Sequence, residues 1–226
     1  MSLRRPQMVL LDLDGTLVDS VPDLAVSVNR MMAQLGRPAH SETSVRHWVG
    51  NGVERLVMRA LTGELWVDPP AAEFEQAMPL FREAYAEVNG HESRLFPGVR
   101  EGLEYLRGAG YRLGCVTNKA EAFTLPLLRA LDVDGFFGII VSGDTLPQKK
   151  PDPAPLLYAA QKLGASAATS LMVGDSEHDV KAARAAGFQV VCVSYGYNHG
   201  VPITEANPDA VVDSLAQIRA LLEDAA

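Results

Sequence analysis

The chain has 226 residues, of which 47% are hydrophobic and 21% are charged, and its net charge is -8. This composition is typical of a folded globular protein and argues against a disordered chain. The acidic balance argues against broad binding to nucleic acid or to an anionic membrane surface, and no apolar run is long enough for a transmembrane helix. Cys115 and Cys192 stand alone in apolar runs, so we expect buried thiols in a protein of the reducing cytoplasm.

Apolar runs alternate along the chain with segments of helical pattern. The strands are predicted at residues 8–13, 111–117, 138–142, 171–174 and 189–194, with a short sixth strand at 210–213. The helices between them are predicted at 99–108, 121–131, 153–163 and 177–186. Continuous apolar strands suit a parallel sheet that is covered on both faces. The alternation predicts an α/β fold with a doubly wound, Rossmann-like parallel sheet.

One long stretch, residues 20–94, breaks this alternation because it shows helical patterns and no strand. Ser20 with Pro22 near the first turn has the pattern of a helix start. The apolar residues that follow recur at helical spacing: Leu24, Val28, Met31 and Leu35. We therefore predict a helical cap domain over 20–94, inserted into a core domain made of 1–19 and 95–226.

Acidic residues follow two of the predicted strands. Asp12 and Asp14 come after the first strand, and Asp175 and Asp179 after the fourth. Ligands of doubly wound sheets bind at the carboxyl ends of the strands. A carboxylate can attack phosphorus, a second one can transfer a proton, and Mg²⁺ prefers oxygen ligands such as these. Taken separately, the first pair also fits a polar turn and the second pair a helix cap.

Two more polar segments follow predicted strands. Thr117 and Asn118 end the second strand, where a hydroxyl and turn amides can hold phosphoryl oxygens. Lys150 directly precedes Pro151, which stiffens the approach to a helix. Alone, these segments also fit a strand-to-helix turn and a solvated lysine pair, Lys149 and Lys150. Together with the acidic residues they provide the positioning, metal and charge neutralisation that phosphoryl transfer needs.

These residues resemble the four motifs of the haloacid dehalogenase superfamily in its phosphatase branch, and the motifs frame the whole chain. The resemblance implies that Asp12 is the nucleophile and that Asp14 acts as general acid and then as general base. It implies that Thr117 and the backbone around Asn118 hold the phosphate. Lys150 would orient the nucleophile and the phosphate.

The resemblance also implies a Mg²⁺ site formed by Asp12, Asp175 and the main-chain carbonyl of Asp14, with Asp179 in support. Dehalogenases of the superfamily lack the second aspartate because a halide leaves without a proton. The presence of Asp14 therefore indicates an alkoxide leaving group. The expected partner is a small anionic phosphate ester, with no nucleic acid and no membrane, and the oligomeric state, monomer or dimer, stays open.

Further segments resemble members of this branch that hydrolyse 2-phosphoglycolate: 19–24, 96–99, 117–119, 150–156 and 195–198. In the predicted cap, Gly50, Asn51 and Gly52 precede a helical stretch, and a helix start of this kind offers N–H groups to an anion. We expect this turn to meet the substrate carboxylate, with Arg55 as a helper, although a plain helix cap is the simpler alternative. His178 is interpreted as an exposed helix residue.

Three alternatives remain open from the sequence. The first is a related phosphatase for a sugar phosphate, such as N-acetylmuramic acid 6-phosphate, or for pyrophosphate. The second is a phosphomutase, which would return the phosphoryl group to a sugar. The third is a phospho-accepting signalling module, which also uses clustered aspartates, threonine and lysine. Its acceptor would follow the third strand, where Asp144 is the only candidate, and it has no place for a large helical cap.

Overall fold

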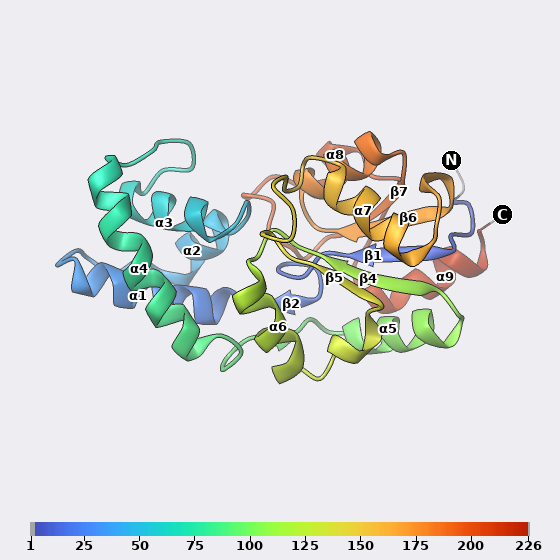
Figure 1. Ribbon diagram of the computed structural model, residues 1–226, viewed down its shortest axis with the longest axis horizontal. Helices are drawn as coiled ribbons and strands as arrows, with labels where there is room; N and C mark the ends of the chain where they lie inside the picture. The colour runs from blue at the N-terminus through green and yellow to red at the C-terminus, as the bar shows by residue number, and fades with distance from the viewer. Residues whose placement is uncertain (1–2, 226) are drawn as a thin grey trace.

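The computed structural model describes residues 3–225 (Figure 1). Its centre is a parallel sheet of six strands in the order β5-β4-β1-β6-β7-β8. The sheet strands are β1 (Met8–Leu11), β4 (Arg112–Val116), β5 (Ile139–Val141), β6 (Ser170–Gly174), β7 (Gln189–Val193) and β8 (Ala210–Val212). The α/β fold, the parallel sheet and the short sixth strand that the sequence predicts are confirmed.

Helices cover both faces of this sheet, as Figure 1 shows. They are α5 (Val99–Gly108), α6 (Glu121–Ala130), α7 (Ala154–Leu163), α8 (Glu177–Ala186) and α9 (Ile218–Glu223). Single 3₁₀ turns lie at Asp134–Phe136, Ala167–Thr169, Ile203–Ala206 and Leu215–Gln217. The side chains of β1 alternate between the two faces: Val9 and Leu11 join one hydrophobic cluster, Met8 and Leu10 the other. Both faces are therefore buried, which explains why β1 is apolar at every position.

The first strand ends earlier than the predicted boundary at residue 13, because the chain turns away from the sheet after Leu11. The backbone N–H groups of Leu17 and Val18 both donate to the Leu13 carbonyl and close this turn. Gly15 lies inside the turn with φ 85°, and a Cβ atom on it would lie 2.2 Å from Asp175 Oδ2. Only glycine fits there. The turn places the acidic pair at the carboxyl edge of the sheet.

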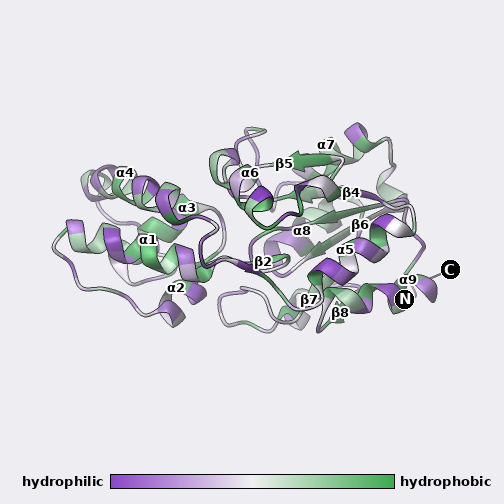
Figure 2. Ribbon diagram, turned by 90° about the horizontal axis from the view of Figure 1, so that it is seen from below, coloured by the Kyte–Doolittle hydropathy of each residue, from purple (hydrophilic) through white to green (hydrophobic). Residues whose placement is uncertain are grey.

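The predicted helical insertion is confirmed as a group of four helices, called the cap below. They are α1 (Val21–Gln34), α2 (Glu42–Trp48), α3 (Val53–Thr62) and α4 (Ala71–Val88). The cap helices share a hydrophobic cluster that includes the buried residues Val28, Met31 and Phe81, and Phe123 and Tyr197 of the core also belong to it. In Figure 2 the cap helices show mixed polar and apolar residues, whereas the strands of the sheet are mostly hydrophobic. This pattern fits amphipathic helices that pack on one another.

The two connections between the sheet and the cap pair with each other, which the sequence analysis missed. β2 (Val18–Asp19) and β3 (Arg94–Leu95) form a two-stranded antiparallel sheet. Arg94 lies within the stretch predicted to hold no strand, so that prediction was wrong at its last residue. Strands of two residues are too short to show an alternating pattern. The exact limits of the predicted domains, 1–19, 20–94 and 95–226, stay a prediction.

Asp23, in the first turn of α1, binds the segment 90–93 that leads from the cap back to the core. Ser20 does not cap this helix. Ser20 precedes the helix as predicted, but its side chain makes no capping hydrogen bond. The buried carboxylate of Asp23 accepts hydrogen bonds from the backbone N–H groups of Gly90, Glu92 and Ser93, and one from the Ser93 hydroxyl.

Across residues 3–225, no helix combines the length and the apolar character needed to cross a membrane.

Candidate active site

A pocket lies between the carboxyl edge of the sheet and the cap. Its wall on the sheet side consists of Asp12, Asp14, Thr117, Asn118, Lys119, Lys150, Asp175, Ser176, His178, Tyr197 and His199. Its wall on the cap side consists of Leu24, Val49, Gly50, Asn51, Gly52, Val53 and Leu56. The structure therefore brings most of the predicted site residues into one pocket.

Asp12 follows β1 and has one carboxylate oxygen fixed in place. Its Oδ1 atom accepts a hydrogen bond from the Leu13 N–H at 2.7 Å and lies 2.9 Å from Lys150 Nζ. Within residues 3–225, no hydrogen bond is found to the Oδ2 atom. One oxygen is thus held in place, and Asp12 lines the pocket. A fixed carboxylate at a pocket is the arrangement that an attacking group needs.

Lys150 is held between two carboxylates. Its ammonium lies 2.9 Å from Asp12 and 2.7 Å from Asp179, and its side chain is only 2% exposed. Burial lowers the pKa of Lys150, but the two carboxylates outweigh this and raise it above the usual lysine range. The Asn118 side chain fixes the Lys150 backbone, since its Oδ1 accepts from the Lys150 N–H at 3.0 Å and its Nδ2 donates to the Lys150 carbonyl at 2.9 Å.

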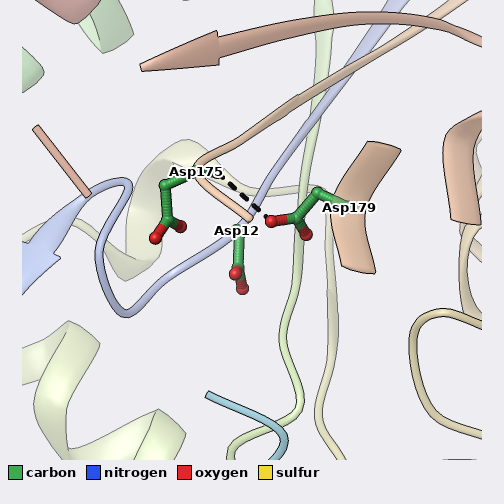
Figure 3. Close-up of side chains that lie close together, drawn as sticks. All are labelled: Asp12, Asp175 and Asp179. Carbon is green, nitrogen blue, oxygen red and sulfur yellow. Dashed lines mark hydrogen bonds between the residues drawn. The ribbon is translucent and has the colours of Figure 1, made fainter. Parts of the chain in front are cut away.

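Three carboxylates, from Asp12, Asp175 and Asp179, each offer an oxygen within 4.8 Å of the others. Figure 3 shows them projecting toward one place from the ends of different elements. Asp175 is oriented by the Thr16 hydroxyl at 2.7 Å and the Tyr197 N–H at 2.6 Å. Hard oxygen donors gathered at one point fit a divalent cation such as Mg²⁺.

Asp179 makes more hydrogen bonds than the other two carboxylates. Its Oδ2 accepts from the N–H groups of Asp175 and Ser176 and from the Ser176 hydroxyl, while its Oδ1 accepts from Lys150. Both oxygens are therefore engaged in orienting neighbours. This fits the supporting role that the resemblance implies for Asp179 better than direct binding of a cation.

The charge of the cluster is unbalanced in favour of the carboxylates. Burial raises the pKa of Asp12 to about 7, although Lys150 acts in the opposite direction. Burial, together with Asp179 and Asp12, raises the pKa of Asp175 well above its usual value. The pKa of Asp179 is lowered, because Lys150 and Ser176 outweigh the effect of its burial. One ammonium does not neutralise three carboxylates, so a bound cation would stabilise their ionised forms.

Asp14 is contacted by Lys119, a residue to which the sequence analysis gives no role. Lys119 Nζ lies 3.1 Å from each carboxylate oxygen of Asp14 and also donates to the hydroxyl of Tyr85 on α4. Burial lowers the pKa of Lys119, but Asp14 and Tyr85 outweigh it and raise the pKa overall. The signal available in the sequence was a lysine directly after Thr117 and Asn118. Thr117 itself lines the pocket, and its hydroxyl accepts from the Lys119 N–H at 3.1 Å.

The cap contributes Gly50, Asn51 and Gly52 to the pocket, with φ values of 130°, 68° and 89°. Asn51 Oδ1 is buried and has no hydrogen-bond partner within residues 3–225. Arg55 is not brought to the pocket: its guanidinium pairs with Asp68 at 2.6 Å on the exposed side of α3. The expectation of Arg55 as a helper therefore lacks a contact, because its position on the helix points it away.

His178 differs from its predicted role. The sequence analysis places it at an exposed position of the helix that became α8, whereas the structure places it in the pocket wall. Its Nδ1 atom is buried with no hydrogen-bond partner among the described residues. Burial lowers the pKa of His178.

Comparison with known proteins shows which family the chain resembles. The profile of the family "Haloacid dehalogenase-like hydrolase" matches residues 9–193. A protein of Nitrosococcus oceani named "Phosphoglycolate phosphatase" is 55% identical over 224 residues, which cover 99% of this chain and 100% of the relative. A protein of Nitrosospira multiformis with the same name is 49% identical over 215 residues, 95% of each chain. A crystal structure described as "a predicted phosphoglycolate phosphatase from Haemophilus somnus 129PT" superposes with a TM-score of 0.89 at 37% identity, and the match covers 97% of this chain and 99% of that one.

The fold and the pocket define a hydrolase with a Rossmann-like core and an inserted cap. The chain belongs to the haloacid dehalogenase-like hydrolase family. It is an enzyme, a phosphatase similar to the relatives named above, which confirms the family that the four motifs predict.

Proposed function

We propose that this enzyme is a Mg²⁺-dependent phosphoric monoester hydrolase that works through an aspartyl-phosphate and acts on 2-phosphoglycolate. The observation that carries the proposal is the placement of Asp12. Its Oδ1 is fixed by Leu13 and Lys150, and both Asp12 and Asp14 line the pocket. A positioned nucleophile beside a separate proton donor is what a two-step phosphatase requires.

In the first step, Asp12 Oδ2 attacks phosphorus in line with the ester oxygen. The bond between phosphorus and the ester oxygen breaks, and protonated Asp14 gives its proton to that oxygen, so that the alcohol leaves. Lys150, Thr117 and Asn118 line the pocket. We expect the Lys150 ammonium, the Thr117 hydroxyl and the N–H groups around Asn118 to hold the phosphoryl oxygens. The products of this step are the alcohol and Asp12 carrying the phosphoryl group.

In the second step, the Asp14 carboxylate takes a proton from a water molecule as the water oxygen attacks phosphorus. The bond between phosphorus and Asp12 breaks, which returns the Asp12 carboxylate and releases inorganic phosphate. Asp14 is again protonated and ready for the next ester. One residue thus serves as acid and then as base, as the geometry around Asp14 permits.

The residues that would hold Mg²⁺ are Asp12, Asp175 and the main-chain carbonyl of Asp14, with Asp179 in support. When bound, the cation would supply positive charge that offsets the carboxylates and the phosphoryl oxygens. Thr16 and Tyr197 keep Asp175 turned toward this place. The proposed compartment is a reducing cytoplasm, and the buried free thiols of Cys115 and Cys192 support it.

The proposed contact for the substrate carboxylate is the turn Gly50-Asn51-Gly52 before α3. We expect Gly52→Ala to raise KM for 2-phosphoglycolate by about tenfold, the value of one charge-assisted hydrogen bond, because a Cβ there changes a backbone that now has φ 89°. Ethyl phosphate, which has no carboxylate, is the matched control ester. An equal rise in KM for both esters would show that this turn does not bind the substrate carboxylate.

Phosphate release from a panel of esters tests the proposed function. The panel contains 2-phosphoglycolate, ethyl phosphate, sugar phosphates including N-acetylmuramic acid 6-phosphate, and pyrophosphate. We expect the highest kcat/KM for 2-phosphoglycolate, complete loss of release with a chelator, and recovery with excess Mg²⁺. A higher kcat/KM for another ester would reassign the substrate, and release that a chelator leaves unchanged would overturn the metal requirement.

A further inference from the structure

We propose that Lys119 and Tyr85 are positioning residues for Asp14, and that they make the placement of this acid and base depend on the cap. The inference rests on the proposed function, because it concerns the group that protonates the leaving oxygen. Lys119 lies in the turn after β4, and Tyr85 lies on the cap helix α4. Lys119 contacts Asp14 directly, and Tyr85 acts on Asp14 only through its contact with Lys119.

The Lys119 ammonium contacts both Asp14 and Tyr85. Its Nζ lies 3.1 Å from Asp14 Oδ1 and 3.1 Å from Asp14 Oδ2, and it donates to the Tyr85 hydroxyl. An ammonium has three protons and no acceptor, so two carboxylate oxygens and one hydroxyl occupy all of them. Contact with both oxygens fixes the plane of the Asp14 carboxyl group, which contact with one oxygen would leave free to turn.

The burial of Lys119 indicates that its charge, and not its bulk, is what the site uses. Its side chain is 2% exposed, whereas that of Asp14 is 18% exposed. Burying an ammonium carries a large desolvation penalty, and apolar residues of similar size often replace buried ion pairs without loss of stability. Packing alone therefore does not require lysine at this position. A contact with the Asp14 carboxylate, in contrast, requires a positively charged side chain here.

Tyr85 connects this pair to the cap. Its ring is buried between Phe81 of α4 and Phe123 of α6, with ring centroids 5.6 Å and 4.8 Å away. Asn89, at the end of α4, donates to the Phe123 carbonyl at 2.8 Å. Figure 1 shows the lower half of α4 beside α6. The Tyr85 hydroxyl thus reaches Lys119 only while α4 lies against α6, and the full set of contacts of the Lys119 ammonium forms only in that arrangement.

The test is the dependence of kcat/KM on the leaving group, since kcat/KM covers the steps from substrate binding to release of the alcohol and excludes hydrolysis of the aspartyl-phosphate. Ethyl phosphate needs a proton donor for its leaving oxygen, whereas 4-nitrophenyl phosphate needs little help. We expect Lys119→Met to lower kcat/KM for ethyl phosphate by about 10²-fold, and for 4-nitrophenyl phosphate by less than about tenfold. Tyr85→Phe should show the same pattern with a smaller loss of kcat/KM. Asp14→Asn removes the proton donor itself and gives the largest expected loss for comparison.

Lys162→Met and Tyr158→Phe are matched controls, because Lys162 Nζ lies 5.4 Å from the Tyr158 ring outside the pocket. We expect them to leave both esters unaffected. An equal loss on both esters in Lys119→Met and Tyr85→Phe would overturn the proposal and assign the pair a purely structural role. If Lys119→Met does not fold, Tyr85→Phe alone decides. Wild-type enzyme that releases no phosphate from any ester would instead contradict the proposed function.

Discussion

Replacing Asp12 by asparagine should lower phosphate release by about 10⁴-fold or more, because the amide oxygen is a far weaker nucleophile than the carboxylate. The substitution conserves size, and Leu13 N–H and Lys150 would still find an oxygen at this position. We therefore expect the variant to fold and to keep an unchanged circular dichroism spectrum. The measurement is kcat for 2-phosphoglycolate, or for the best ester of the panel, at saturating Mg²⁺.

Asp132→Asn is the matched control for this substitution. The Asp132 side chain is 97% exposed, and its φ of 54° suits asparagine. We expect wild-type turnover from it. Turnover within about tenfold of wild type in a correctly folded Asp12→Asn enzyme would show that Asp12 is not the nucleophile.

Replacing Lys150 by methionine should lower kcat/KM by about 10²–10³-fold, since it removes the positive group that we propose contacts the phosphoryl oxygens. It also leaves Asp12 and Asp179 without their shared ammonium. Removing one partner of a buried ion pair costs about 3–5 kcal/mol in the free energy of unfolding. Urea unfolding of the wild type and the variant in a chelator measures this loss without any contribution from a cation.

The stability loss of Lys150→Met should depend on pH in a defined direction. Burial already raises the pKa of Asp12 from 3.8 to about 7 in the folded protein, and loss of Lys150 raises it further. A carboxyl group whose folded pKa is raised favours folding at low pH, and this contribution is lost as the pH rises through that pKa. The difference from wild type should therefore be larger at about pH 8 than at about pH 5. A difference that is independent of pH would contradict the charge balance described for this cluster.

Much of the core could be predicted from the sequence because its signals are local. The strand β1 is apolar at every position, and Gly164 and Gly187 end α7 and α8 in the left-handed conformation. The motif residues Asp12, Thr117, Lys150 and Asp175 each follow a strand, so the parallel topology alone brings them to one edge. Prediction of that topology was sufficient to group them.

The contacts that the sequence analysis missed join residues far apart in the chain. Tyr85 has the pattern of an ordinary buried aromatic of a helix, and only the folded arrangement of α4 and α6 brings its hydroxyl to Lys119. Asp23 has the pattern of a first-turn acidic residue, yet its carboxylate holds the segment 90–93. Arg55 follows the anion-binding turn, but the direction of α3 turns it toward Asp68. Local patterns do not carry this information.

Contacts between the cap and the core link the position of the cap to the proposed reaction. The paired strands β2 and β3 and the Asp23 contacts form the base of the cap, and the Tyr85 hydroxyl contacts Lys119 of the core. A closed cap excludes bulk water from the aspartyl-phosphate, and an open one releases the products. Placing the contact to Lys119 on α4 would coordinate closure with the alignment of Asp14.

The central claim is that Asp12 carries the phosphoryl group, and mass spectrometry of the acid-quenched enzyme tests it most directly. The Asp14→Asn enzyme with 4-nitrophenyl phosphate and Mg²⁺ is suited to this measurement, because its first step needs little acid and its second step lacks the base. Our account predicts release of one equivalent of nitrophenol and one phosphoryl group on the peptide that contains Asp12. Continued release from enzyme that stays unmodified, or a phosphoryl group on another residue such as Asp144, would contradict it.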